Sequence, residues 1–318
     1  MEKKFAERIR QRFPEGLTGI LAIGGSRIGY ILQHNRDEED PGHIDLANYT
    51  ATTLAQFFTL IERFFMLGGQ NLVIPTLSYQ RFTVYDVKYR EYISATTLLL
   101  TEPDAVRFYQ RHNIDPYFVG IDTLFKLPAD NPGHQLGIAL TAFQQAWNYQ
   151  EGRRKLLWEI APIPLYSFWN AKNSVDAETL ADVEHEIEQM TDLDMIYQTL
   201  YRLYARAVYG TEIPVPHFYI GTNRNGDLKL RSMLPISLLN GSNTRFYFTP
   251  YPTLFISPET FQAIIEDVAF GSTLSSTKSD YAARLTPEVV SKEFERVMAL
   301  SADTQTTIGF VRHIDADD

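Results

Sequence analysis

Short, nearly unbroken apolar segments alternate with longer segments of helical apolar spacing, and this alternation limits the possible folds more than any other feature. Near-continuous apolar runs are typical of strands that are buried on both faces. Strands are expected at residues 17–23, 71–78, 115–121, 155–162, 216–221 and 244–249. Helices are expected at residues 3–13, 44–67, 89–100, 103–112, 134–149, 175–190, 193–208, 258–270 and 287–300.

Strands that alternate with helices predict an α/β fold, with a central, mainly parallel sheet flanked by helices on both faces. No linker-like stretch and no internal repeat divides the sequence. We therefore expect a single domain over residues 1–318.

Composition excludes several classes of protein. The net charge of −10 argues against nucleic-acid binding, which needs a basic surface. The absence of cysteine removes disulfides, thiolate nucleophiles and cysteine metal ligands. The charged first residues lack the apolar core of a signal peptide, and no apolar run is long enough to span a membrane. A cytoplasmic protein is expected.

The stretch LTGILAIGGSRIGY, residues 17–30, carries the strongest functional signal. An apolar strand runs into Gly24 and Gly25, which are followed by Ser26 and Arg27. Glycines let backbone N–H groups approach a phosphate, and a guanidinium matches its oxygen atoms. This pattern favours a local pocket for an anionic group, although strand-to-glycine turns also serve as plain connections.

In an open parallel sheet, ligands bind outside the carboxyl ends of the strands. This rule brings further segments to the edge that holds the glycine turn. They are Ser78 and residues 120–122, 161–164 and 221–224. Arg224 and Arg231 are candidates for a diphosphate site there, and solvated loop arginines are the equally open alternative.

Six stretches in order resemble the cis-prenyltransferases, and more closely their diterpene synthase branch, the family of tuberculosinol and kolavelool synthases. They are GGSRIGY (24–30), NYTATTLAQFFTLI (48–61), LVIPTLS (72–78), FYQRHNI…GID…LP (108–128), YIG (219–221) and SLLNGSNTRFYFT (237–249). The resemblance covers most of the chain and implies the cis-prenyltransferase-like α/β fold. It also implies a homodimer.

The resemblance further implies a reaction. A bicyclic C20 allylic diphosphate, of kolavenyl or tuberculosinyl type, would ionise and be captured by water as a diterpene alcohol. Arg27 and Tyr49 are the catalytic residues that it implies. The substrate-binding residues expected at the strand ends are Gly24, Gly25, Ser26, Arg27, Ser78, Arg224 and Arg231.

Two positions depart from the family pattern. Gly24 stands where the family has an aspartate that holds Mg²⁺, so we expect any Mg²⁺ to bind mainly through the substrate diphosphate. No metal ligand is assigned, and the candidates for a protein carboxylate are Asp45 and the acidic run 37–40. Gly221 stands where elongating members have an arginine for isopentenyl diphosphate.

Two alternatives stay open at this point. The chain would elongate a prenyl chain with isopentenyl diphosphate, or it would be an inactive prenyltransferase-like partner subunit. Other enzyme classes lack their motifs, because the sequence holds no HExxH, GxSxG, DDxxD or Walker lysine.

Overall fold

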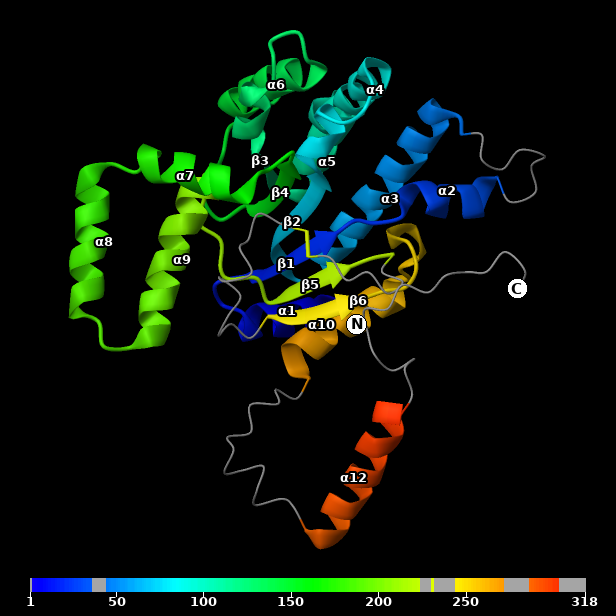
Figure 1. Ribbon diagram of the computed structural model, residues 1–318, viewed down its shortest axis with the longest axis vertical. Helices are drawn as coiled ribbons and strands as arrows, with labels where there is room; N and C mark the ends of the chain where they lie inside the picture. The colour runs from blue at the N-terminus through cyan, green and yellow to red at the C-terminus, as the bar shows by residue number, and fades with distance from the viewer. Residues whose placement is uncertain (1, 36–43, 224–229, 232–243, 272–285, 303–318) are drawn as a thin grey trace.

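The computed structural model describes residues 2–35, 44–223, 230–231, 244–271 and 286–302 (Figure 1). Within these residues, the strands form one sheet in the order β3-β4-β2-β1-β5-β6, and every neighbouring pair is parallel. The strands are β1 (Leu17–Ala22), β2 (Gly69–Leu77), β3 (Ile114–Val119), β4 (Arg154–Ile160), β5 (Phe218–Gly221) and β6 (Arg245–Phe248). The predicted α/β fold with a central parallel sheet is confirmed.

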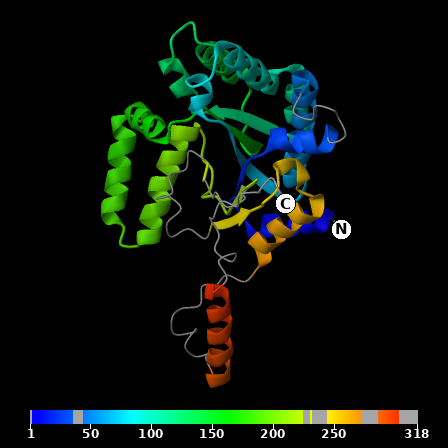
Figure 2. The same cartoon turned by 45° about the vertical axis from the view of Figure 1, so that its right-hand side comes forward.

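Helices cover both faces of this sheet, as Figures 1 and 2 show from two directions. One face is covered by α1 (Glu2–Arg12), α3 (Leu46–Met66), α5 (Pro103–His112), α6 (Pro132–Ala146) and α10 (Pro258–Phe270). The other face is covered by α9 (Leu193–Tyr209). The remaining helices are α2 (Ser26–His34), α4 (Val87–Leu98), α7 (Pro164–Ser174), α8 (Ala177–Gln189) and α12 (Pro287–Ala302).

The larger core lies between the sheet and α3. Ile61, Phe64 and Phe65 are fully buried, because their spacing places them on the sheet-facing side of that helix. Gly69 begins β2 beneath Phe64, and a β-carbon there would lie 2.3 Å from the Phe64 ring. Full burial of such a ring contributes about 2–3 kcal/mol, so α3 is firmly seated above β1 and β2.

Most expected elements lie where the apolar pattern predicts them, within a few residues at each end. Two helices differ from the expectation. α2 begins at Ser26, directly after the glycine turn, where no helix was expected. α7 was also not expected, because its large apolar residues Leu165 and Trp169 are exposed and give no buried stripe. The run TTIGFVR near the end of the sequence, residues 306–312, lies outside the described residues.

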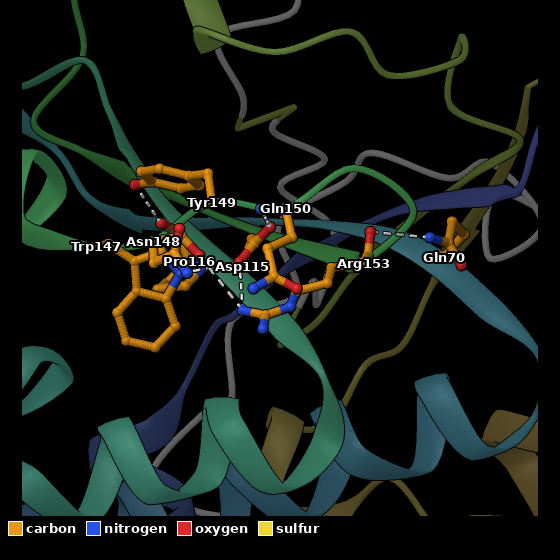
Figure 3. A network of polar contacts seen from close by, with 8 residues as sticks. All are labelled: Gln70, Asp115, Pro116, Trp147, Asn148, Tyr149, Gln150 and Arg153. Atoms are coloured by element: carbon orange, nitrogen blue, oxygen red, sulfur yellow. Dashed lines mark hydrogen bonds and ion pairs between the residues drawn. The ribbon is translucent and has the colours of Figure 1, made fainter.

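The amino end of β3 is fixed by a buried carboxylate, as Figure 3 shows. Asp115 Oδ1 accepts hydrogen bonds from Trp147 Nε1 (2.9 Å) and Arg153 Nη1 (3.3 Å). Its Oδ2 accepts from the Gln150 backbone N–H at 3.0 Å. Asp115 is 1% exposed, so these donors offset the cost of burying its charge. The network joins β3 to the loop before β4.

The outer edge of β3 has few free hydrogen-bonding groups. Pro116 has no N–H, and its carbonyl accepts from Tyr149 Oη at 2.9 Å (Figure 3). The next outward-facing amide, on Phe118, donates to the side chain of Gln144. Side chains of the chain itself therefore bind the Pro116 carbonyl and the Phe118 amide on this edge.

None of the helices in the described ranges is long and apolar enough to cross a membrane.

His217 generates a prediction about acid stability. Its Nδ1 accepts from the Thr18 backbone N–H at 3.0 Å, and burial lowers the pKa of the ring from 6.5 to about 4. The unfolded chain therefore binds this proton at a higher pH than the folded chain. The free energy of unfolding therefore has its full value above pH 6.5 and falls by about 3 kcal/mol as the pH drops towards 4.

Urea unfolding between pH 4 and pH 7 measures this dependence. His217→Asn keeps an acceptor but does not titrate, so it is expected to flatten the curve in this window. His185→Asn, on exposed α8, is the control and should leave the slope unchanged. An unchanged slope in His217→Asn contradicts the assignment.

Candidate functional site

The glycine turn joins β1 to α2 at the carboxyl edge of the sheet. Gly25 is the residue before the helix and adopts φ 68° and ψ 19°, a left-handed conformation that favours glycine. Gly25 offers no side chain to cap this helix, and within the described part of the chain no side chain accepts from the N–H groups of its first turn. Together with the helix dipole, these groups suit an anion.

Gly24 is held from behind by two threonines that were not predicted. Its N–H donates to Thr222 Oγ1 at 2.7 Å and to Thr253 Oγ1 at 3.1 Å. Its carbonyl accepts from the Thr253 backbone N–H at 3.1 Å. Because the Gly24 N–H donates to groups inside the protein, Gly24 contributes to the site by shaping the turn.

Tyr49 reaches the turn from α3. Its hydroxyl lies 2.9 Å from Ser26 Oγ, and its ring packs edge-on against Tyr30 with centroids 5.3 Å apart. Four of the predicted site residues, namely Gly24, Gly25, Ser26 and Tyr49, therefore meet at one place. The strand-end rule predicted the position of the glycine turn, whereas Tyr49 lies on a helix and was implied only by the family resemblance.

Arg27 is exposed in the first turn of α2. Its positive charge acts on Tyr92 of α4, which places the two side chains in the same neighbourhood. Burial raises the pKa of Tyr92, whereas the hydrogen bond with Thr50 and the charge of Arg27 act in the opposite direction. The Tyr92 hydroxyl lies 2.9 Å from Thr50 Oγ1, one residue after Tyr49. Helix α4 thus forms a second wall beside the turn.

A row of tyrosines continues along this wall. The rings of Tyr85 and Tyr89 lie 4.5 Å apart, and those of Tyr89 and Tyr92 lie 6.4 Å apart. Arg81, from the short 3₁₀ helix Tyr79–Phe82, donates to the hydroxyls of Tyr85 (2.9 Å) and Tyr89 (3.1 Å). The spacing of 85, 89 and 92 is a helical stripe in the sequence, so this signal was present but not used.

The remaining predicted binding residues are less closely gathered. Ser78 follows β2 at the same edge, is exposed, and donates to Gln80 Oε1 at 3.0 Å. Arg231 is exposed, and its backbone N–H donates to Tyr219 Oη at 2.9 Å. Arg224 lies outside the described residues. The binding roles of all three stay predictions.

The described residues do not form a set of ligands for a protein-held Mg²⁺. Residue 24 has no side chain, and the Asp45 carboxylate caps α3 by accepting from Ala47 N (3.0 Å) and Asn48 N (3.3 Å). No group of three or more His, Asp or Glu side chains suited to a metal occurs in the described part of the chain. The acidic run 37–40 lies outside it.

A cavity of 590 Å³ lies elsewhere, beside β3, α7 and the end of α9. Its polar centre is Asp122, whose two oxygens accept from Ser167 Oγ and Asn170 Nδ2, each at 3.0 Å. None of the described residues predicted as catalytic or substrate-binding lines it, whereas residues 120–122, which the strand-end rule placed at the binding edge, do. The Asp122 carboxylate thereby links α7 to the turn after β3, and this role is structural.

Comparison with known proteins supports the fold. No protein-family model and no curated protein sequence matches this chain. A crystal structure of lavandulyl diphosphate synthase from Lavandula x intermedia, in complex with dimethylallyl diphosphate, matches with a TM-score of 0.52 and 18% identity. The match covers 80% of this chain and 96% of that one. The fold is therefore the α/β fold of the cis-prenyltransferases.

A second similar structure is that of a probable undecaprenyl diphosphate synthase from Campylobacter jejuni. It has a TM-score of 0.46 and 12% identity, and the match covers 80% of this chain and 94% of that one.

The geometry of the turn predicts binding of inorganic pyrophosphate in which Arg27 takes part. A hydrogen bond to a charged group contributes about 1.5–3 kcal/mol, so Arg27→Ala should weaken this binding about tenfold to a hundredfold. Titration calorimetry measures the affinity. Arg202 is exposed on α9, and Arg202→Ala is the matched control. Equal affinities of Arg27→Ala and the parent would remove Arg27 from the site.

Proposed function

We propose that this protein is a terpene synthase that ionises a bicyclic C20 allylic diphosphate and adds water, giving a diterpene alcohol and diphosphate. The observation that carries the proposal is the uncapped start of α2, directly after the glycine turn, with the Ser26–Tyr49 pair above it. The similar lavandulyl diphosphate synthase was crystallised with dimethylallyl diphosphate, an allylic diphosphate, which supports this substrate class.

The first step breaks the allylic C–O bond, and its electron pair leaves with the diphosphate. Negative charge grows on the diphosphate oxygens as this bond breaks. In this proposal the N–H groups of residues 26–28 and the Arg27 guanidinium bind the diphosphate, and such donors lower the barrier as this charge develops. No protein-held metal takes part in this account.

The second step forms a C–O bond between water and the allylic cation. Aromatic faces stabilise positive charge, and Tyr89 and Tyr92 line the wall next to Arg27. Tyr49 and Ser26 share one hydrogen bond, so their free lone pairs can orient the attacking water. The proton lost by that water goes to the departed diphosphate, which is the strongest base nearby.

The end of β5 favours ionisation over elongation. Gly221 pairs between β1 and β6, and a β-carbon there would lie 2.8 Å from Phe248 Cδ1. The arginine that the resemblance expects here for isopentenyl diphosphate would displace that ring. Chain elongation and an inactive partner subunit remain the alternatives. Incubation with prenyl diphosphates distinguishes them.

The test is incubation of the purified protein with geranylgeranyl, kolavenyl and tuberculosinyl diphosphates, with and without Mg²⁺. Gas chromatography with mass spectrometry should detect a diterpene alcohol from at least one bicyclic substrate. Radiolabelled isopentenyl diphosphate should not enter longer products. Labelled chains would establish elongation instead, and no product from any substrate would favour the inactive subunit.

Tyr49→Phe tests the residue that joins α3 to the turn. Loss of one positioned hydroxyl should lower kcat about a hundredfold, with the fold retained. Tyr197 lies on α9, on the other face of the sheet. Tyr197→Phe is therefore the control and should have the kcat of the parent. Single-turnover kinetics distinguish the chemical step from product release, and a Tyr49→Phe protein with full kcat would exclude this role.

A further inference from the structure

The two threonines behind Gly24 form a closed hydrogen-bonded unit. Their hydroxyls lie 2.6 Å apart, and Thr222 and Thr253 are 0% and 2% exposed. Thr222 directly follows β5, and Thr253 begins the 3₁₀ helix Thr253–Phe255. Both hydroxyls reach the N–H and the carbonyl of Gly24. Buried hydroxyls require partners, and here the partners belong to the turn itself.

The same packing leaves no room for a side chain at residue 24. A β-carbon on Gly24 would lie 2.4 Å from the Thr222 carbonyl oxygen and 3.3 Å from Thr222 Oγ1. The oxygen is backbone, and the Thr222 N–H is bound to the Ala22 carbonyl at 3.3 Å. Relief of the clash therefore requires separation of β5 from β1, not the rotation of a side chain.

Gly25 is enclosed on its other side by a side chain, that of Asn223. A β-carbon there would lie 2.6 Å from Asn223 Cγ, and the Asn223 N–H donates to the Tyr251 carbonyl at 2.8 Å. The two glycines are therefore backed by residues 222–223 and 251–253. This backing sets the direction in which the first N–H groups of α2 point.

We propose that Thr222 and Thr253 are positioning residues that hold the glycine turn in its anion-binding shape, in a slot closed to any side chain at residue 24. Restoring the family's aspartate at this position would then damage the site instead of supplying a metal ligand. Any Mg²⁺ at the site would be carried by the diphosphate. The ligand class rests on the proposed function, whereas the threonine unit rests on the geometry alone.

Thermal unfolding without ligand tests the threonine unit. Thr253→Val removes the hydroxyl and should lower the Tm by several degrees, and Thr253→Ser should restore most of the loss. Gly24→Ala should also lower the Tm. Thr249→Val is the matched control, because that buried hydroxyl bonds Tyr251 and not Gly24. If Thr253→Val and Gly24→Ala both have the Tm of the parent, the proposal is overturned.

Calorimetry with inorganic pyrophosphate, with and without Mg²⁺ and well below every Tm, tests positioning. Thr253→Val should bind about tenfold more weakly than Thr249→Val, and Thr253→Ser should bind like the parent. Gly24→Asp should bind more weakly than the parent in both conditions. Tighter Mg²⁺-dependent binding by a stable Gly24→Asp protein overturns the proposal, as does equal binding by the two valine variants.

The two proposals fail separately. If Arg27→Ala and the parent bind pyrophosphate equally, the proposed function loses its diphosphate site. The melting temperatures of Thr253→Val, Thr253→Ser and Gly24→Ala still decide whether the threonine unit holds the turn.

Discussion

The close approach of the end of β1 to the end of β5 is the contact on which the candidate site depends. Only a glycine permits it, because the Thr222 carbonyl occupies the space that a β-carbon of residue 24 would fill. β1 also lies between β2 and β5, so the turn cannot shift without disturbing pairs on both sides. The direction of α2 is thus fixed by the centre of the sheet.

Much of this arrangement could be predicted from the sequence. Alternating apolar and helical segments predicted the parallel sheet, and the rule on strand ends placed the glycine turn at its carboxyl edge. Tyr49 was implied only by the resemblance to the prenyltransferase family. The Thr222–Thr253 pair could not be found in this way. These residues are 198 and 229 positions from Gly24, and threonine near a strand end has no distinctive local pattern. The arginines near 224–231 remain predictions.

In a protein of net charge −10, the proposed site would bind an anion through dipoles more than through charges. Backbone N–H groups, hydroxyls and phenols are the main polar groups around the turn, and Arg27 adds a local positive charge. Arg81 donates to the hydroxyls of Tyr85 and Tyr89 and adds a second guanidinium beside the row of tyrosines.

The outer edge of β3 has a consequence for solubility. A strand edge with free N–H and C=O groups is a template on which another chain can add a strand. Here a proline removes one donor, and Gln144 and Tyr149 bind the neighbouring amide and carbonyl. A foreign strand would find no continuous ladder to extend. Replacing Pro116 with a residue that carries an N–H would restore one donor of such a template. Self-association would be the first expected effect.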